Sequence, residues 1–584
     1  MLKKKLSLFA VLLLGAMSCA GCSSDSKDKI IIRVLNSADY IYEAEEEGWY
    51  CEECGKYVEE SDTHIDIVDE KEVRVHNKCG EIVEYDCDMM DQFVRYMDEK
   101  YAPEGLKFDY VYDTFDTPET CYNEMMTGKS NYDVINVSDY MIQKMITNDL
   151  LTPLFDGSEE SNDIKQNLRD NLSDYLWGEE DSIYNNIHPK KLEYNDGEDP
   201  YDNSKILSDY AVPYMWGTVG VMFNPAFKGY QDFTTDELIE KFSSWEALYS
   251  ESIKGSFSIK DSVRDVYAVS IIHVYHDEIE GLKTKYHIGE IDEDLQGFNQ
   301  EMTVIFNRCD AETLKKVSDD MNQLKENSFG FEVDSGKTDM VSGEKIGANL
   351  AWSGDATWAI YEALTENDVE IYFSLPDEGS NIFTDSWGIP KVSSHPQYAL
   401  DFIDFMCAEE QALQNMDYVG YTSSTATEGI LEYLYDMYDV RAAEEDYPDE
   451  EYDLYDIRYF FDGNIDDSEL DNAILHSWKY DTEATFEEEI DGKTKEFSYS
   501  VYARMLRAQF PEQSQRHKLC MMDDFGKDNQ AVIEMWQQVR TSPLPLWAII
   551  VLSVEIAAAL GFIVLIIVKK QRFKKIKEKR LISK

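Results

Sequence analysis

The sequence predicts an α/β fold with more than one lobe. Strand-like apolar runs alternate with amphipathic, helix-like runs at the spacing typical of parallel βαβ units. The chain has 584 residues, which is long enough for two or more lobes with their own cores. Hydrophobic residues make up 43% of the chain, and its 38 tyrosines argue against disorder.

The alternation begins at residue 29 and can be followed in order. Lys29–Tyr42 has the pattern of a buried strand that runs into a loop, and Met89–Tyr101 has the spacing of an amphipathic helix. The next segments predict a strand at 106–115, a helix from 118 that ends at Gly128, and a strand, loop and helix over 132–155.

The rest of the chain repeats this rhythm between two polar segments. Residues 156–208 are acidic and Asn-rich, residues 431–500 are acidic and Tyr-rich, and both are expected to be surface insertions. The expected elements are, in order, a strand pair at 210–224, a helix, strand and helix over 243–275, a helix at 310–327, a strand, turn and helix over 345–364, two strands within 369–390, one helix at 395–416, a hairpin around Asp491-Gly492 and a helix at 529–540.

The N-terminus carries the features of an export signal. Lys3-Lys4-Lys5 precedes an apolar run, Leu6–Met17, and small residues follow up to Ala20-Gly21-Cys22. We expect residues 1–21 to be a signal peptide and Cys22 to be lipidated. The alternatives are ordinary cleavage nearby or an uncleaved signal.

The C-terminus predicts a second membrane anchor. Residues 544–568 are almost wholly apolar, long enough to cross a bilayer as a helix, although Glu555 lies within the span. Residues 569–584 are strongly basic, which is typical of the cytoplasmic side. The protein is therefore expected at the cell membrane, with the chain between the two anchors outside the cell.

The net charge of -62 limits the possible partners. Nucleic acid is disfavoured, because its phosphates would be repelled. A cationic ligand is compatible with this charge, although acidic surface mostly serves solubility.

A cysteine-rich segment at 48–87 predicts a metal site. Cys-x2-Cys-Gly followed by His-x2-Cys-Gly resembles the paired knuckles of a zinc ribbon, and four nitrogen and sulfur ligands suit a closed structural zinc site. The expected ligands are Cys51, Cys54, His76 and Cys79. Two alternatives remain open: two disulfides, or Cys87 in place of His76. A catalytic zinc is disfavoured, because four ligands leave no open position.

Seven segments, in order along the chain, resemble one family: the spermidine/putrescine-binding proteins of ABC importers, within the larger set of periplasmic-type solute-binding proteins. The segments are NSADYI, YDTFDTPETCYNEMMTGKSNYDVINVSDYMIQKM, YAVPYMWGTVGVMFN, SWEALYSESIKGSFSIKDSVRDVY, GEKIGANLAWSGDA, TDSWGIP and VGYTSST.

This resemblance implies a two-lobed, type II-like periplasmic-binding-protein fold, with the ligand between the lobes and crossing strands near Pro213 and Asp385. It divides the chain into the signal peptide (1–21), the first strand of lobe 1 (22–47), the zinc-ribbon-like insert (48–87), lobe 1 continued (88–213), lobe 2 (214–385), the return to lobe 1 (386–430), the C-terminal part of lobe 2 (431–540), the membrane span (544–568) and the tail (569–584).

The resemblance also implies a polyamine site. Such a site needs carboxylates for the protonated amines and aromatic walls for the methylenes, with cation–π contacts worth about 0.5–2 kcal/mol each. The positions that match the family's ligand contacts are Asp39, Tyr40, Ser138, Tyr140, Asp265, Trp352, Phe383, Asp385 and Tyr421. The residues alone also allow plainer interpretations, such as Arg264 forming a structural ion pair with Asp265.

Three positions depart from the family pattern. Ser37 and Phe383 stand where tryptophans are usual, and Ser262 stands where a second carboxylate is common. These changes point to a shorter diamine, a weaker affinity or a different cation. Trp216 or Tyr214 is a candidate replacement for the missing stacking face.

The expected function is therefore a non-enzymatic one: capture of a polyamine for an ABC permease. The alternatives are binding of another small cation or a metal, and ligand sensing by a membrane-tethered receptor. An enzyme such as a surface hydrolase is disfavoured, since the sequence has no nucleophile motif, no HExxH and only nine histidines.

Overall fold

The computed structural model describes residues 29–541 except 45, 52–53, 69–70, 129, 179–206, 334, 444–451 and 491–492. Within these residues, no helix is both long and apolar enough to cross a membrane. The predicted signal peptide, the lipidation site Cys22, the span at 544–568 and the basic tail lie outside them. The chain divides into two units, 1–529 and 530–584.

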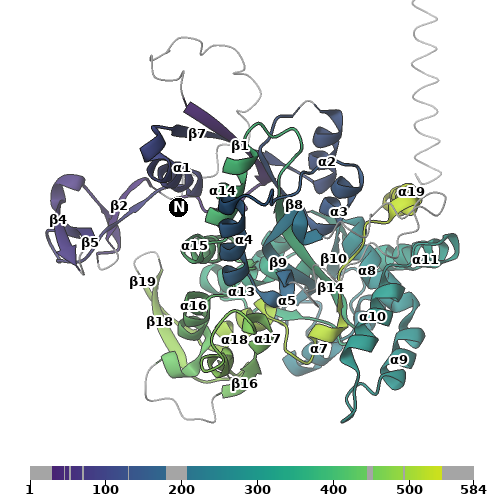
Figure 1. Cartoon of the computed structure of the whole chain (residues 1–584). Helices are drawn as coiled ribbons and strands as arrows, with labels where there is room; N and C mark the ends of the chain where they lie inside the picture. The colour runs from purple at the N-terminus through teal and green to yellow at the C-terminus, as the bar shows by residue number, and fades with distance from the viewer. Residues whose placement is uncertain are drawn as a thin grey trace, which may run out of the picture. The chain divides into compact units, whose positions relative to one another are not determined.

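One 11-stranded sheet organises the first unit, and its main path runs β11-β10-β12-β9-β14-β8-β1-β7 (Figure 1). The path consists of β1 (Lys29–Ser37), β7 (Lys107–Phe115), β8 (Val134–Ser138), β9 (Ala211–Phe223), β10 (Phe257–Lys260), β11 (Gly330–Glu332), β12 (Ala348–Trp352) and β14 (Ser380–Gly388). Three short strands pair beside it: β13 (Tyr372–Ser374), β15 (Thr422–Ser423) and β20 (Leu519–Cys520).

The sheet consists of two parallel groups joined by an antiparallel centre. β1 pairs in parallel with β7 and β8, and β10 pairs in parallel with β11 and β12. Between these groups, β9 and β14 pair with each other in antiparallel fashion, with an irregularity between Asp385 and Ser386. The two strands predicted to cross, at Pro213 and Asp385, are thus direct neighbours.

The predicted strand pair at 210–224 is wrong, because β9 is one continuous strand of 13 residues, all buried. The glycines in this run make room for neighbours instead of forming a turn. A Cβ on Gly217 would lie 2.7 Å from Oγ of Ser353 and 3.0 Å from Cζ of Phe383.

Helices cover both parts of the sheet. They are α1 (Met89–Lys100), α2 (Pro118–Thr127), α3 (Asp139–Thr147), α4 (Glu159–Asn171), α5 (Asp174–Trp177), α7 (Thr235–Phe242), α8 (Val263–Val274), α9 (His276–Lys285), α10 (Leu295–Phe306), α11 (Ala311–Asn327), α12 (Ser335–Ser342), α13 (Ser353–Asn367), α14 (Pro396–Met406), α15 (Glu409–Val419), α16 (Glu428–Tyr438), α17 (Arg458–Phe461) and α18 (Ser500–Gln509). The last helix, α19 (Asn529–Arg540), belongs to the second unit from Gln530 on.

Two helical predictions need correction. The single helix expected at 395–416 is two helices, α14 and α15, separated at Cys407-Ala408. The segment 156–208 is not all surface, because Leu168 and Trp177, in α4 and α5, are at most 1% exposed. No local pattern predicts this burial, since these apolar residues are sparse among acidic neighbours.

The cysteine segment forms a small separate module. β2 (Gly48–Cys51), β3 (Lys56–Val58) and β6 (Glu84–Asp86) make a three-stranded sheet, and β4 (Thr63–Val68) and β5 (Lys71–His76) make a hairpin. In Figure 1 these strands stand apart from the main sheet, on the side of α1.

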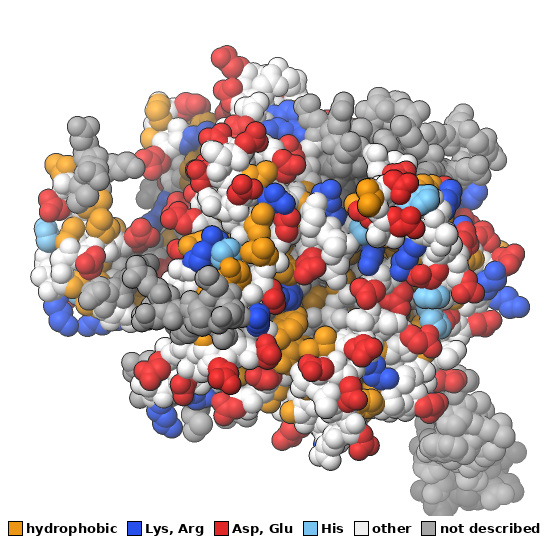
Figure 2. All heavy atoms as spheres, turned by 90° about the horizontal axis from the view of Figure 1, so that it is seen from below, with side chains coloured by type: hydrophobic (Ala, Val, Ile, Leu, Met, Phe, Trp, Pro, Cys, Tyr) orange, Lys and Arg blue, Asp and Glu red, His pale blue; other side chains and the backbone are white. Residues whose placement is uncertain are grey.

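Two further hairpins occur in the late, acidic part of the chain. β16 (Tyr452–Asp456) pairs with β17 (Ile474–Trp478), and β18 (Thr485–Ile490) pairs with β19 (Lys493–Ser498). The second pair flanks Asp491-Gly492, so the hairpin predicted there is confirmed. Acidic side chains are spread over the whole face shown in Figure 2, with no single basic patch among them.

Candidate functional site

Asp385 is held at the centre of the sheet by two hydroxyl groups. Tyr40 donates a hydrogen bond to Oδ2 of Asp385 at 2.8 Å, and Ser138 donates to Oδ1 at 2.6 Å. Ser138 ends β8, and Asp385 faces it across the β8–β14 pair. The sequence placed these three residues far apart, 247 and 345 positions from Asp385, and the fold brings them together.

The second predicted carboxylate, Asp265, lies in α8, beside the end of β12. The indole nitrogen of Trp352 donates to its Oδ2 at 3.1 Å. Trp352 ends β12, and Asp265 lies in the first turn of α8, which is capped by Ser262. The Asp265 side chain is thus fixed by a neutral donor, as Asp385 is.

A lysine that the sequence analysis did not single out covers the Trp352 ring. Nζ of Lys260 lies 4.1 Å from the ring centre and forms ion pairs with Asp355 at 3.0 Å and with Glu332 at 3.2 Å. Lys337 pairs with the other oxygen of Asp355 at 3.4 Å. The predicted stacking face thus already carries an internal ammonium group.

Tyr421 connects the two halves of the site. Its ring lies edge-on to Tyr40 at 5.3 Å, and its hydroxyl donates to Asp355 at 3.3 Å. Burial raises its pKa well above the usual value, and Asp355, Asp385 and Asp265 raise it further. All three carboxylates therefore act on one phenol.

Tyr140 and Arg264 form a cation–π contact. The guanidinium carbon of Arg264 lies 4.2 Å from the centre of the Tyr140 ring and 4.1 Å from that of Phe525. Arg264 also donates to the carbonyl of Asp523 and pairs with Asp524 at 3.8 Å. Among the described residues no ion pair joins Arg264 to Asp265, although the charge of Arg264 acts to lower the pKa of Asp265.

The remaining predicted residues make fewer contacts with the carboxylates of the site. Asp39 is exposed in a left-handed turn with φ of 53°, and within the described residues no hydrogen bond or ion pair joins it to the others. Phe383 is partly buried and packs over Gly217. Trp216 and Tyr214 are at most 2% exposed in the main core, so they do not offer a replacement stacking face.

Burial raises the pKa of both Asp265 and Asp385. For Asp265, burial outweighs Ser262, Trp352 and the nearby Lys260, and for Asp385 it outweighs the two hydroxyl donors. In the described part of the chain, neither carboxylate forms an ion pair. Because a buried charge is costly unless it is paired, both positions favour a bound cation.

The neighbouring charges balance one another. Burial opposes ionisation of Asp355, but Lys260 and Lys337 outweigh it and hold the pKa of Asp355 below its usual value. Asp139, beside Asp385, accepts a hydrogen bond from the Thr384 backbone at 2.8 Å. Its burial raises its pKa to about 8, so it is mainly uncharged near neutral pH.

Lys260, Asp355, Glu332 and Asp139 were missed by sequence reasoning. One signal was available: Lys260 ends the strand-like run Phe257–Lys260, and Asp355 lies in the first turn of α13, directly after the strand at 348–352. A charged residue at the end of a buried strand needs a partner of opposite charge. The partner itself could not be identified, since it lies 95 residues away.

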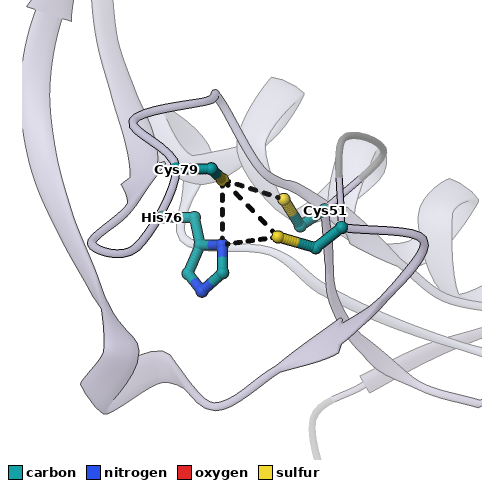
Figure 3. Close-up of side chains that lie close together, drawn as sticks. Cys51, His76 and Cys79 are labelled. Carbon is teal, nitrogen blue, oxygen red and sulfur yellow. Dashed lines mark hydrogen bonds between the residues drawn. The ribbon is translucent and has the colours of Figure 1, made fainter.

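The cysteine module brings its four predicted ligands together (Figure 3). The ligand atoms of Cys51, Cys54, His76 and Cys79 all lie within 4.8 Å of one another. Sγ of Cys79 lies 3.4 Å from Sγ of Cys51, 3.7 Å from Sγ of Cys54 and 3.1 Å from Nδ1 of His76. Cys87 is not part of this cluster.

These distances fit a tetrahedral metal site. Zinc–sulfur and zinc–nitrogen bonds of about 2.3 and 2.0 Å place the ligand atoms roughly 3.5–3.8 Å apart. A disulfide needs sulfurs about 2.05 Å apart, and the cysteines of the cluster are free. The cluster can therefore hold a metal such as zinc.

Comparison with known proteins identifies the family. The family described as bacterial extracellular solute-binding protein matches residues 105–430, more than half of the chain. The spermidine/putrescine-binding periplasmic protein of Escherichia coli (strain K12) is 22% identical over 331 residues, which cover 55% of this chain and 74% of that protein. The putrescine/agmatine-binding protein of Pseudomonas aeruginosa is 24% identical over 317 residues, with coverage of 53% and 70%.

Solved structures are also similar. The spermidine/putrescine ABC transporter substrate-binding protein of Streptococcus pneumoniae, in complex with calcium and HEPES, has a TM-score of 0.42 at 18% identity, and the match covers 88% of this chain and 99% of that chain.

Proposed function

Because this chain belongs to the bacterial extracellular solute-binding protein family, we propose that it captures a small aliphatic diamine, such as putrescine, for an ABC permease. Membership of a solute-binding family supports the prediction that the chain is not an enzyme. The relatives named for putrescine or spermidine make a polyamine the first ligand class to test.

The observation that carries this proposal is the pair of carboxylates Asp265 and Asp385. Each accepts hydrogen bonds from neutral donors and lacks an ion-pair partner within the described residues. Two such carboxylates match two ammonium groups, one at each end of a diamine. The aromatic rings of Tyr40, Trp352 and Tyr421 near them offer apolar surface for the methylenes.

The charge balance favours a diamine over a longer polyamine. Lys260 and Lys337 neutralise Asp355 and Glu332, so neither of these two carboxylates is left for a third amine. The exposed Asp39 is too weakly connected to the site to be assigned to a ligand amine. Ser37, Ser262 and Phe383 pointed to a shorter diamine, a weaker affinity or a different cation. Of these three possibilities, we propose the shorter diamine.

The two anchors and the metal module complete the proposal. Lipidation at Cys22 and a membrane span at 544–568 would hold the receptor beside its permease, since one lipid chain alone gives only marginal anchoring. Zinc bound by Cys51, Cys54, His76 and Cys79 would fold the module at 48–87 and play no part in the capture of the ligand.

Calorimetry tests the assignment. The purified protein is titrated with putrescine, spermidine, spermine and, as a matched uncharged ligand, 1,4-butanediol. We expect heat with putrescine and none with butanediol. Asp385→Asn should weaken putrescine binding by about a hundredfold or more, because it removes a charge from a buried site. Asp39→Asn is the matched control and should change the affinity less than about threefold.

Two outcomes would contradict the proposal. No heat with any of the three amines would exclude polyamines as ligands while leaving the family assignment intact. Equal putrescine affinity in Asp385→Asn and the wild-type protein would show that the ligand binds elsewhere.

A further inference from the structure

A second, separate recess lies between the cysteine module and the main body. It has a volume of about 1830 Å³, well above the 300–1000 Å³ that is usual for small-molecule pockets. One wall comes from β2, β3 and β6 of the module, and the other from α1, α4, α14 and α15 (Figure 1). None of the residues predicted for the polyamine site lines it. We call it the module groove.

The lining of the module groove is acidic and rich in tyrosine. It contains eight carboxylates and six tyrosines, and Arg95 is the one basic side chain among the lining residues that the structure describes. Arg95 is already engaged, with its guanidinium 3.9 Å from the centre of the Tyr85 ring. This contact shows how a guanidinium group is accommodated on a tyrosine face in the groove.

Two polar groups in the groove have unused binding capacity. The carboxylate of Asp86 accepts hydrogen bonds from Tyr42, at 2.7 Å, and from Tyr57, yet forms no ion pair within the described residues. Gln411 lines the groove and is only 8% exposed, and its side-chain amide has no hydrogen-bond partner in the described part of the chain. Its amide atoms keep access to the groove, so an occupant can supply the hydrogen bonds that the described part of the chain does not.

We propose that the module groove binds an extended, lysine- or arginine-rich segment of a partner protein. The groove's volume suits a polypeptide better than a small amine. Its carboxylates suit cationic side chains, its tyrosines suit their alkyl stems and cation–π contacts, and Gln411 suits a backbone amide. The cysteine module then has a role of its own, since it builds one wall of a docking site for a partner.

Fluorescence anisotropy of a dye-labelled octalysine peptide tests this proposal on the full-chain protein at physiological ionic strength. Glu84, Glu99 and Glu410 are exposed, lie on both walls and form no ion pair within the described residues. Removing their charges in the triple variant E84Q/E99Q/E410Q should weaken binding about tenfold. The matched control, E240Q/E326Q/E344Q, removes three exposed charges from the other half of the chain and should change binding less than twofold.

The outcomes distinguish binding in the module groove from attraction to the protein's overall negative charge. Equal loss of affinity in both triple variants would overturn the proposal, because it would mean that octalysine senses only the net charge. Displacement of octalysine by spermidine, at an equal concentration of amine groups, would also overturn the proposal and would favour a small-molecule site. Gln411→Leu should weaken binding several-fold with no loss of thermal stability. Asp385→Asn should leave octalysine binding unchanged, so this proposal and the diamine proposal can fail independently.

Discussion

The ammonium nitrogen of Lys260 lies 4.1 Å from the centre of the Trp352 ring, on the aromatic surface that the sequence assigned to a ligand's amine. The lysine is 1% exposed and bridges Asp355 and Glu332. Burial alone would lower its pKa, but the two carboxylates outweigh burial and raise it, so the lysine is charged. The protein thus carries one cation of its own within the site.

Replacing Lys260 with methionine should therefore change ligand preference. Among the described residues, Lys260→Met leaves Asp355 paired with Lys337 and Glu332 without an ion pair, and creates a place for a third ligand amine. The ratio of spermidine to putrescine affinity should rise by at least about tenfold. Calorimetry with the two amines measures this ratio, and an unchanged ratio would argue against a diamine-specific site.

The same variant should lose stability in the absence of ligand. Breaking a buried ion pair costs about 3–5 kcal/mol, because one charge remains buried and unpaired. Lys337→Met is the matched control: its side chain is 35% exposed, and its one ion pair among the described residues is with Asp355. It should cost about 1 kcal/mol or less in chemical denaturation.

Ligand affinity should increase with pH. Burial raises the pKa of Asp265 and Asp385 above the usual aspartate value of about 3.9. Protons therefore compete with the ligand above that value, and putrescine should bind more tightly at pH 7.5 than at pH 5. In Asp265→Asn or Asp385→Asn the pH dependence should be weaker.

The ligand-free protein should respond to pH in the opposite sense. Carboxyl groups whose pKa is raised in the folded state bind more protons there than in the unfolded state, so their contribution to stability is lost as pH rises. For Asp139, this loss extends to about pH 8. Thermal unfolding should show a stabilisation by putrescine that grows from pH 5 to pH 7.5, and a constant stabilisation would contradict this charge assignment.

The sequence indicated the alternation of the fold because its apolar periodicity is local. It also found the strands that meet at Asp385, because their segments resemble one family. The sequence does not reveal that β9 is a single strand, because its glycines resemble turn signals. Only the structure shows that Gly217 makes room for the side chains of Ser353 and Phe383. The sequence could not reveal the break between α14 and α15, because the apolar spacing continues across Cys407-Ala408.

The candidate site shows the same limit. The members of the cysteine cluster were predictable because two short spacings, Cys51–Cys54 and His76–Cys79, define them. Tyr40, Ser138 and Asp385 were found through the family pattern, and their mutual hydrogen bonds agree with that choice. The balance of charge around Lys260 depends on partners up to 95 residues away, which no local pattern encodes.

Gly354 should be essential for the position of the Tyr421 ring. Gly354 is the second residue of α13, and a Cβ there would clash with three ring carbons of Tyr421. Gly354→Ala must displace this ring from Tyr40 and Asp355, so putrescine affinity should fall about tenfold and stability by about 1–3 kcal/mol. The control is Gly281→Ala in α9, where a Cβ meets no atom within 4 Å. That change should leave affinity unchanged and raise stability by about 0.5–1 kcal/mol.

The metal cluster gives a prediction that separates zinc from disulfides. The wild-type protein should contain about one equivalent of zinc by elemental analysis, while Cys54→Ser and Cys79→Ser should contain little or none, because each removes one of the four ligands. Cys87→Ser is the matched control, since Cys87 is buried nearby but lies outside the cluster, and it should keep the metal.

Loss of zinc should affect the module and spare the main body. A small metal-folded module loses its folding free energy with its metal, so limited proteolysis should cut within 48–87 in Cys54→Ser and leave the rest of the chain intact. Putrescine affinity should not change, because no ligand of the cluster lines the site around Asp385. Octalysine binding should fall, because the strands of the module form one wall of the module groove. Zinc below about half an equivalent in the wild-type protein, or zinc lost from Cys87→Ser, would contradict this ligand set.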